Sequence, residues 1–185
     1  MNPIQDLTAE HEAVRLTLRI LKNIIVDIEK RGEITHKGPI DELLEFFSVF
    51  VDRCHHAKEE KLLFPALEAV GVGREGGPIG VMLKEHQQGR ELVGEMKTAM
   101  RQYRHGEPSA GGRFCQASRK YIDLLSRHID KENQVLFPLA EKHLSASTSA
   151  DLKKGFDRIE TEEIGVGRHE EFHHMLERLE KDYLD

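Results

Sequence analysis

The sequence lacks the features that mark secreted, membrane-spanning or disulfide-bonded proteins. Its only cysteines, Cys54 and Cys115, form no CxxC motif and indicate no disulfide framework. No apolar run reaches the roughly 18 residues typical of a membrane span. The N-terminal stretch carries acidic residues where a signal peptide would have an apolar block. We therefore expect a cytoplasmic protein in a reducing compartment, without a membrane partner.

The chain also lacks an excess of positive charge. It has 27 Lys and Arg residues against 33 Asp and Glu residues, for a formal net charge of −6. A nucleic-acid-binding protein usually shows a basic face, so we expect no nucleic-acid partner. A length of 185 residues fits one domain with a short appendage, as a monomer or homodimer. Histidine is plentiful, with eleven residues, and its positions decide what it means.

No strand pattern is convincing, and the chain reads as helices separated by short breaks. Long helices are expected over about residues 3–30, 38–71, 79–105 and 113–144. Each carries apolar residues at spacings of three and four, which mark the face turned toward a core. We predict an all-α fold: an up-down-up-down antiparallel four-helix bundle over residues 1–145. Residues 146–185 would add one or two C-terminal helices as an appendage.

An internal repeat divides the predicted bundle into two helical hairpins. The pattern HxxKExxxLFPxxE begins at His55 and again 73 residues later at His128. The pattern EHxxxR occurs over residues 10–15 and again over residues 85–90. Each hairpin therefore contributes one histidine from its first helix and a His-x-x-x-Glu pair from its second. This two-fold pseudosymmetry suits a site for two metal ions.

Histidine and glutamate lie on the predicted core faces at matching depths. Residues four apart on a helix share a face. Counted from the hairpin turns at about 1.5 Å per residue, these side chains all lie roughly 30 Å along the helices. An unpaired buried carboxylate is costly and two facing carboxylates repel, so cations are needed among them. The predicted metal ligands are His11, His55, Glu59, His86, His128 and Glu132.

The ligand types narrow the choice of metal without fixing it. Imidazole suits Zn, Cu, Fe and Ni, whereas carboxylate-rich sites suit harder ions. Six ligands exceed one tetrahedral zinc site, but fit two ions that share carboxylates. Helical bundles with di-iron or di-manganese sites use comparable inward-facing residues. Manganese or zinc remains an alternative to iron. Open coordination positions on such ions would accept O₂, NO or peroxide.

The order of these motifs resembles the hemerythrin-like (HHE cation-binding) family over about residues 5–144. The resemblance implies a non-heme di-iron centre, bridged by oxo or hydroxo, on the six residues named above. The four-His, two-Glu set is also similar to a bacterial iron-centre repair branch linked to nitrosative and oxidative stress. Oxygen-carrying hemerythrins place a fifth histidine where this chain has Arg90.

We expect a di-iron protein that binds or processes O₂, NO or peroxide in an oxidative or nitrosative stress response. The alternative is a metal-dependent sensor or iron donor without turnover, and a third reading is a helical adaptor without metal. Whether the chain is an enzyme stays open. Catalytic loss of peroxide or NO in a stopped-flow assay would favour the first reading over the second.

Several further residues could belong to the site, and the sequence argues against each. His56 and Glu60 form a second HxxxE, but the repeat aligns them with Ile129 and Asn133, so they are left out. His169 and Glu163, near the C-terminus, could add a ligand or cap the site; a solvated helix face is the simpler interpretation. Tyr121 could line a ligand channel, although packing is the simpler role. Pro65 and Pro138 have a structural meaning only: we expect them to kink or end their helices.

Overall fold

The computed structural model describes residues 2–184, and every regular element in that range is helical. The all-α prediction is confirmed. The first helix, α1 (Pro3–Arg31), starts with a capping box in which the Asn2 side chain accepts a hydrogen bond from the Ile4 N–H. The Gln5 side chain accepts in turn from the Asn2 N–H. The helix ends at Gly32, whose φ of 75° is readily adopted only by glycine.

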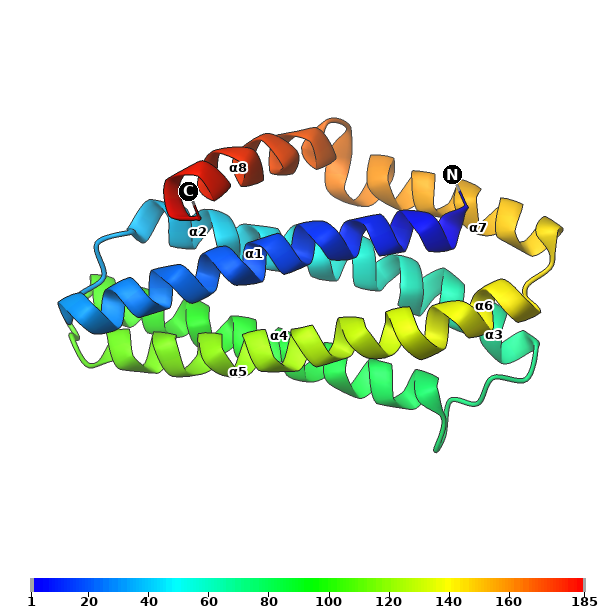
Figure 1. Cartoon of the computed structure of the whole chain (residues 1–185), viewed down its shortest axis with the longest axis horizontal. Helices are drawn as coiled ribbons and strands as arrows, with labels where there is room; N and C mark the ends of the chain where they lie inside the picture. Colours follow the sequence, from blue (N-terminus) through cyan, green and yellow to red (C-terminus); the bar gives the residue numbers. More distant parts are fainter. Residues whose placement is uncertain (1, 185) are drawn as a thin grey trace.

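Three further long helical segments follow α1, and a C-terminal segment built of shorter helices completes the chain (Figure 1). The second segment consists of α2 (Lys37–Phe46), the π-helices η1 (Phe47–His56) and η2 (Glu59–Leu63), and α3 (Phe64–Ala69). The third is α4 (Pro78–Arg104), and the fourth consists of α5 (Ala110–Lys131), π-helix η3 (Glu132–Leu136) and α6 (Phe137–His143). The C-terminal segment consists of α7 (Ala146–Arg158), π-helix η4 (Ile159–Gly165) and α8 (Arg168–Tyr183).

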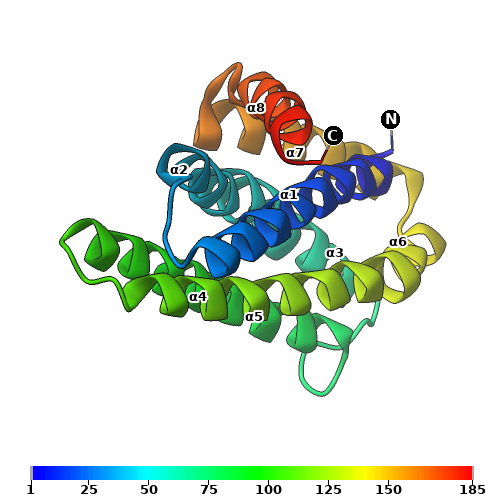
Figure 2. The same ribbon diagram turned by 60° about the vertical axis from the view of Figure 1, so that its left-hand side comes forward.

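The four long segments lie side by side, and the C-terminal segment folds back over two of them (Figures 1 and 2). Helix α5 packs along both α4 and α1. Helix α8 packs against α1 and α2, η4 against η1, and α7 against α1 and η2. One face of the first and second segments is therefore covered by the C-terminal segment.

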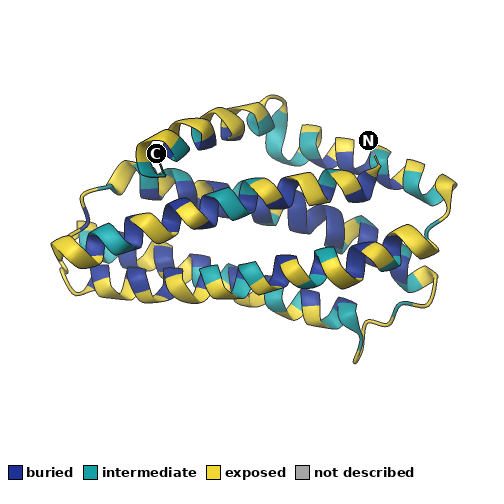
Figure 3. Cartoon of the chain, viewed as in Figure 1, coloured by how far each residue is buried: buried dark blue, intermediate teal, exposed yellow. Residues whose placement is uncertain are grey.

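Two large apolar clusters fill most of the interior. Figure 3 shows the buried residues as one face along each helix. On α1, Ile4 and Leu7 belong to the smaller cluster, and residues from Val14 onward belong to the larger one. Glu10 and His11 are buried between them. Each fully buried aliphatic or aromatic side chain contributes about 1.5–3 kcal/mol, so these clusters provide the stability that tolerates a polar layer.

The prolines of both LFP motifs were expected to kink or end their helices, and the structure shows that neither ends one. Helix α3 continues through Pro65 to Ala69, and α6 continues through Pro138 to His143. A π-helix directly precedes each of these helices. Proline has no N–H to donate and clashes with the carbonyl of residue i−4, and a wider π-helical turn relieves both problems.

Candidate metal centre

The structure brings the six predicted side chains together in the polar layer between the clusters. They come from α1, η1, η2, α4, α5 and η3, and each is at most 2% exposed. The histidines form two pairs. The Nε2 atoms of His11 and His55 are 3.1 Å apart, and those of His86 and His128 are also 3.1 Å apart. In both pairs, the nitrogens that can donate lone pairs to a metal face one another.

The two glutamates lie between the histidine pairs. Glu132 places one carboxylate oxygen 3.1 Å from His11 Nε2 and the other 3.1 Å from His128 Nε2. Glu59 places one oxygen 3.7 Å from His55 Nε2 and the other 3.3 Å from His86 Nε2. All four carboxylate oxygens are buried without a hydrogen-bond partner. Such oxygens are costly unless a cation pairs them, and each carboxylate contacts one histidine of each pair.

Burial and mutual charge shift the pKa values of this layer. Burial, together with the charge of Glu132, raises the pKa of Glu59 well above its usual value. Burial also acts on Glu132, but the nearby His128 and His11 outweigh it and hold its pKa well below the usual value. Burial lowers the pKa of His55 and His86. Neutral imidazole is the form that binds metal, so burial favours the ligand form of these two histidines.

Each of the four histidines is oriented by a second side chain at its Nδ1 atom. A partner at Nδ1 fixes the ring tautomer and directs the Nε2 lone pair into the site, as is usual for metal-binding histidines. The four contacts are His55 with Glu10 (2.7 Å), His128 with Glu85 (2.9 Å), His86 with Glu60 (2.7 Å) and His11 with Asn133 (2.8 Å).

The internal repeat encodes part of this outer layer, which the sequence analysis did not recognise. The glutamate of each EH pair reaches the histidine of the opposite helix in its hairpin, as Glu10 does with His55. The lysine of each HxxKE pattern then binds that glutamate: Lys58 pairs with Glu10, and Lys131 pairs with Glu85. The signal was present, because the glutamate and the lysine are shared letters of the repeated motifs.

Comparison with known proteins identifies this arrangement. The protein-family model described as the hemerythrin HHE cation binding domain matches residues 2–140 of this sequence. The chain belongs to this family. The resemblance seen in the motifs is therefore confirmed, and the HHE domain spans the four long helical segments that carry the six side chains.

Curated relatives of this HHE domain include proteins of known and unknown role. An uncharacterized protein of Mycobacterium tuberculosis is 25% identical over 164 residues, which are 87% of this chain and 62% of the relative. The iron-sulfur cluster repair protein YtfE of Salmonella typhimurium is 39% identical over 90 residues, or 46% of this chain and 40% of the relative. The iron-sulfur cluster repair protein DnrN of Neisseria gonorrhoeae is 34% identical over 86 residues, or 45% and 54%. The matches thus cover less than two thirds of each relative.

His56, which the sequence analysis left out, lies against the metal centre of this HHE domain. Its ring stacks on that of His86, with centroids 3.7 Å apart and planes 16° from parallel. One ring nitrogen lies within 4.8 Å of ligand atoms of Glu59, His86 and His128. The repeat aligned His56 with Ile129, which lies in an α-helix, but His55 and His56 belong to a π-helix, which turns less per residue. Glu60 orients His86 from outside the cluster.

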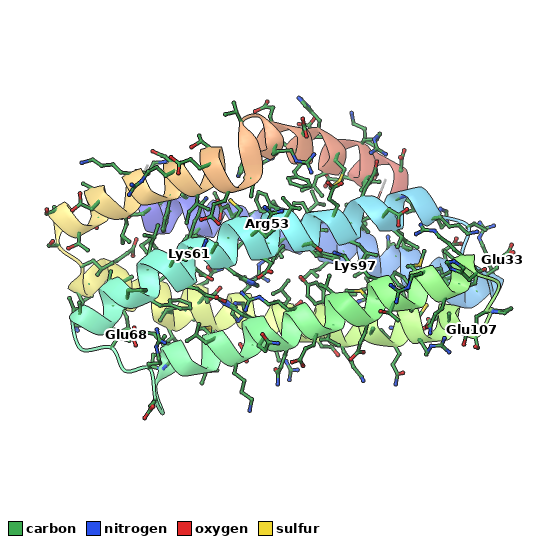
Figure 4. All side chains as sticks on the ribbon, turned by 180° about the vertical axis from the view of Figure 1, so that it is seen from behind. Glu33, Arg53, Lys61, Glu68, Lys97 and Glu107 are labelled. Carbon is green, nitrogen blue, oxygen red and sulfur yellow. The ribbon has the colours of Figure 1, made fainter. Side chains whose placement is uncertain are left out.

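The C-terminal candidates are His169 and Glu163. Of these, His169 lies near Glu10, the carboxylate that contacts His55. His169 is 34% exposed, and its Nε2 lies 3.9 Å from Glu10. Glu10, Glu160 and His169 form a third group with metal-ligand spacing. The Lys58 ammonium already binds the two carboxylates of this group, Glu10 and Glu160. Glu163 binds Lys61 at 2.7 Å near the surface. Lys61 is labelled on the second helical segment in Figure 4.

A cavity lies between η1 and α4, next to the metal centre. Its volume is about 310 Å³, and its lining includes Val51, Asp52, His56, Arg90 and Tyr121. Tyr121 is also buried in the larger apolar cluster, so it both packs and borders this cavity. Within residues 2–184, no helix is long and apolar enough to cross a membrane.

Proposed function

We propose that this HHE domain holds two non-heme iron ions between the six predicted ligands. One ion would be held by His11 and His55, and the other by His86 and His128. Glu59 and Glu132 would bridge them. The observation that carries the proposal is the set of four buried carboxylate oxygens without hydrogen-bond partners, each within 4.0 Å of a histidine Nε2. We further propose that residues 1–145 form an up-down-up-down four-helix bundle, with residues 146–185 as its appendage.

The iron pair would supply open coordination positions and redox chemistry for O₂, NO or peroxide. The residues of this chain provide the environment. The Nε2 atoms bind the ions, the Nδ1 partners hold the imidazoles in the metal-binding tautomer, and the carboxylates neutralise charge. The apolar clusters on both sides of the polar layer exclude bulk water.

We propose a cytoplasmic role in oxidative or nitrosative stress, because two relatives are named as iron-sulfur cluster repair proteins. One structural observation favours the alternative of a sensor or iron donor without turnover. Glu160 of the C-terminal segment binds Lys58 at 2.5 Å, Lys58 binds Glu10, and Glu10 binds His55. The chain of contacts would let the C-terminal segment respond to the state of one ion.

Metal analysis after anaerobic loading with Fe(II) tests the proposal. We expect two irons per chain in the wild-type protein and in a His36→Ala control, because His36 binds Asp27 and Tyr183 away from the centre. Glu132→Gln should lose at least one iron, since it removes the charge of a bridging ligand. A wild-type protein that retains no iron would contradict the di-iron assignment. Stopped-flow mixing with peroxide or NO then separates turnover from a stoichiometric spectral change.

A further inference from the structure

His56 is a buried histidine that the six-ligand proposal leaves without a role. It is 4% exposed, and neither of its ring nitrogens has a hydrogen-bond partner. Buried polar groups in native proteins are almost always paired, because an unpaired one costs free energy. A histidine that served only to fill space could be replaced by an aliphatic residue, and the repeat has Ile129 at the corresponding place.

We propose that His56 is a fifth histidine ligand, bound to the ion that His86 and His128 hold. The proposal rests on the two-ion centre proposed above and extends its ligand set. One ring nitrogen of His56 and ligand atoms of Glu59, His86 and His128 all lie within 4.8 Å of one another. Nitrogen and oxygen ligands lie about 2.0–2.2 Å from a transition-metal ion, so ligands on opposite sides are about 4.4 Å apart. The observed spacing needs only small shifts to accept an ion.

His56 also has a carboxylate near its Nδ1, as His55, His86 and His128 do, although at a longer distance. Its Nδ1 lies 3.6 Å from an Asp52 carboxylate oxygen, which is too long for a hydrogen bond. That leaves Nε2 as the proposed ligand atom. Arg90 holds Asp52 at 2.7 Å and also holds Glu60, the partner of His86, at 2.6 Å. A single guanidinium therefore fixes the two carboxylates that face the Nδ1 atoms of neighbouring histidines.

The proposed ligand makes the two ions unequal. The second hairpin has no equivalent, because Ile129 is buried in the α-helical α5, whereas His56 belongs to the π-helical η1. The ion between His86 and His128 would have three histidines, and the ion between His11 and His55 would have two. The two-histidine ion would then keep more open positions. Exogenous small molecules should bind there first.

Replacing His56 with phenylalanine separates coordination from packing. Phenylalanine keeps a flat ring that can stack on His86 but carries no nitrogen. His56→Ile is the second variant, because it copies Ile129 of the repeat, and His36→Phe is the control for loss of a histidine elsewhere. Each protein is loaded anaerobically with Fe(II). Iron content and the time course of iron release to a chelator are then measured, with circular dichroism to verify folding.

We expect the wild-type protein and His36→Phe to release both irons at the same rates. His56→Phe and His56→Ile should release one of the two irons at least about 10-fold faster, since even loss of an outer partner weakens metal binding 10- to 100-fold. Unchanged release in both folded variants would overturn the His56 proposal while leaving the six-ligand centre intact. A wild-type protein without two irons would instead overturn the centre itself, and His56 with it.

A measurement on the wild-type protein decides the matter if neither variant folds. Mössbauer spectra of the ⁵⁷Fe(II)-loaded protein report the two ligand environments separately. Unequal ions should give two quadrupole doublets of equal area. A single doublet would mean equivalent ligand sets and would overturn the assignment of His56 to one ion.

Discussion

The buried ammonium of Lys58 provides a direct test of how the outer layer of the metal centre is held. Its side chain is 0% exposed and binds both Glu10 and Glu160. Burial alone would lower the pKa of Lys58, but the charge of Glu10 outweighs burial and raises it. Replacing Lys58 with methionine keeps most of the volume and removes the charge. Glu10 then stays buried with His55 as its remaining partner.

The expected loss of stability follows from this burial. Breaking a buried ion pair by removing one partner typically costs about 3–5 kcal/mol. Because Glu10 keeps its contact with His55, we expect the lower end, about 3 kcal/mol, for Lys58→Met. For a protein of this size, the loss corresponds to a fall in Tm of about 6–12 °C. Equilibrium urea unfolding and thermal unfolding of the metal-free protein measure both quantities.

The repeat supplies a matched control at Lys131. Lys131 binds Glu85 as Lys58 binds Glu10, but its side chain is 40% exposed. An exposed ion pair contributes about 0–1 kcal/mol, so Lys131→Met should cost at least about 2 kcal/mol less than Lys58→Met. The two variants could instead lose the same free energy of unfolding to within about 0.5 kcal/mol. Burial by the C-terminal segment would then not explain the contribution of the Lys58–Glu10 pair to stability, and the prediction would be refuted.

Two further predictions concern how the C-terminal segment docks. In Gly155→Ala, the new Cβ would lie 2.7 Å from a Leu62 methyl group, so we expect a loss of about 1–3 kcal/mol in urea unfolding. Gly94→Ala meets no atom within 4 Å and should be neutral or slightly stabilising, and equal effects at both glycines would refute the close packing of α7. Glu163→Gln should leave the iron content unchanged, because this carboxylate is paired with Lys61 near the surface; a loss of iron would make Glu163 a ligand after all.

The convergence of the six proposed ligands could be predicted because it depends on helical period and hairpin length alone. His55 and Glu59 share a face at a spacing of four, and they meet His86 across the interior. The Nδ1 partners could not be placed in the same way. Glu10 and Glu60 are each adjacent in sequence to a core-facing residue. Helical rotation alone therefore places their side chains on the side of the helix, beside the core-facing surface. Only the packing of neighbouring helices shows that each flank faces a histidine.

His56 was left out because the repeat aligns it with Ile129, and α-helical rotation gave no reason to restore it. In an α-helix, adjacent residues differ by about 100°, which would direct His56 away from a centre that His55 faces. The structure has a π-helix over Phe47–His56, and the wider turn places both rings against the centre. Local sequence does not predict that change, because the corresponding stretch of the repeat, around His128, is α-helical.

The two hairpins of the repeat differ most where the C-terminal segment covers one of them. Lys58 is enclosed by Glu160 and by the Phe156 ring, whereas its counterpart Lys131 is partly exposed to water. Interactions between charges weaken with exposure, because water and salt screen them. A change of charge at an ion bound to His55 would therefore be transmitted through Glu10 and Lys58 with little screening. The equivalent change beside His128 would be screened at Lys131. In the proposed centre, pseudosymmetry would supply the ligands in duplicate, and contact with the C-terminal segment would couple that segment to the half-site of His55 more strongly than to the half-site of His128.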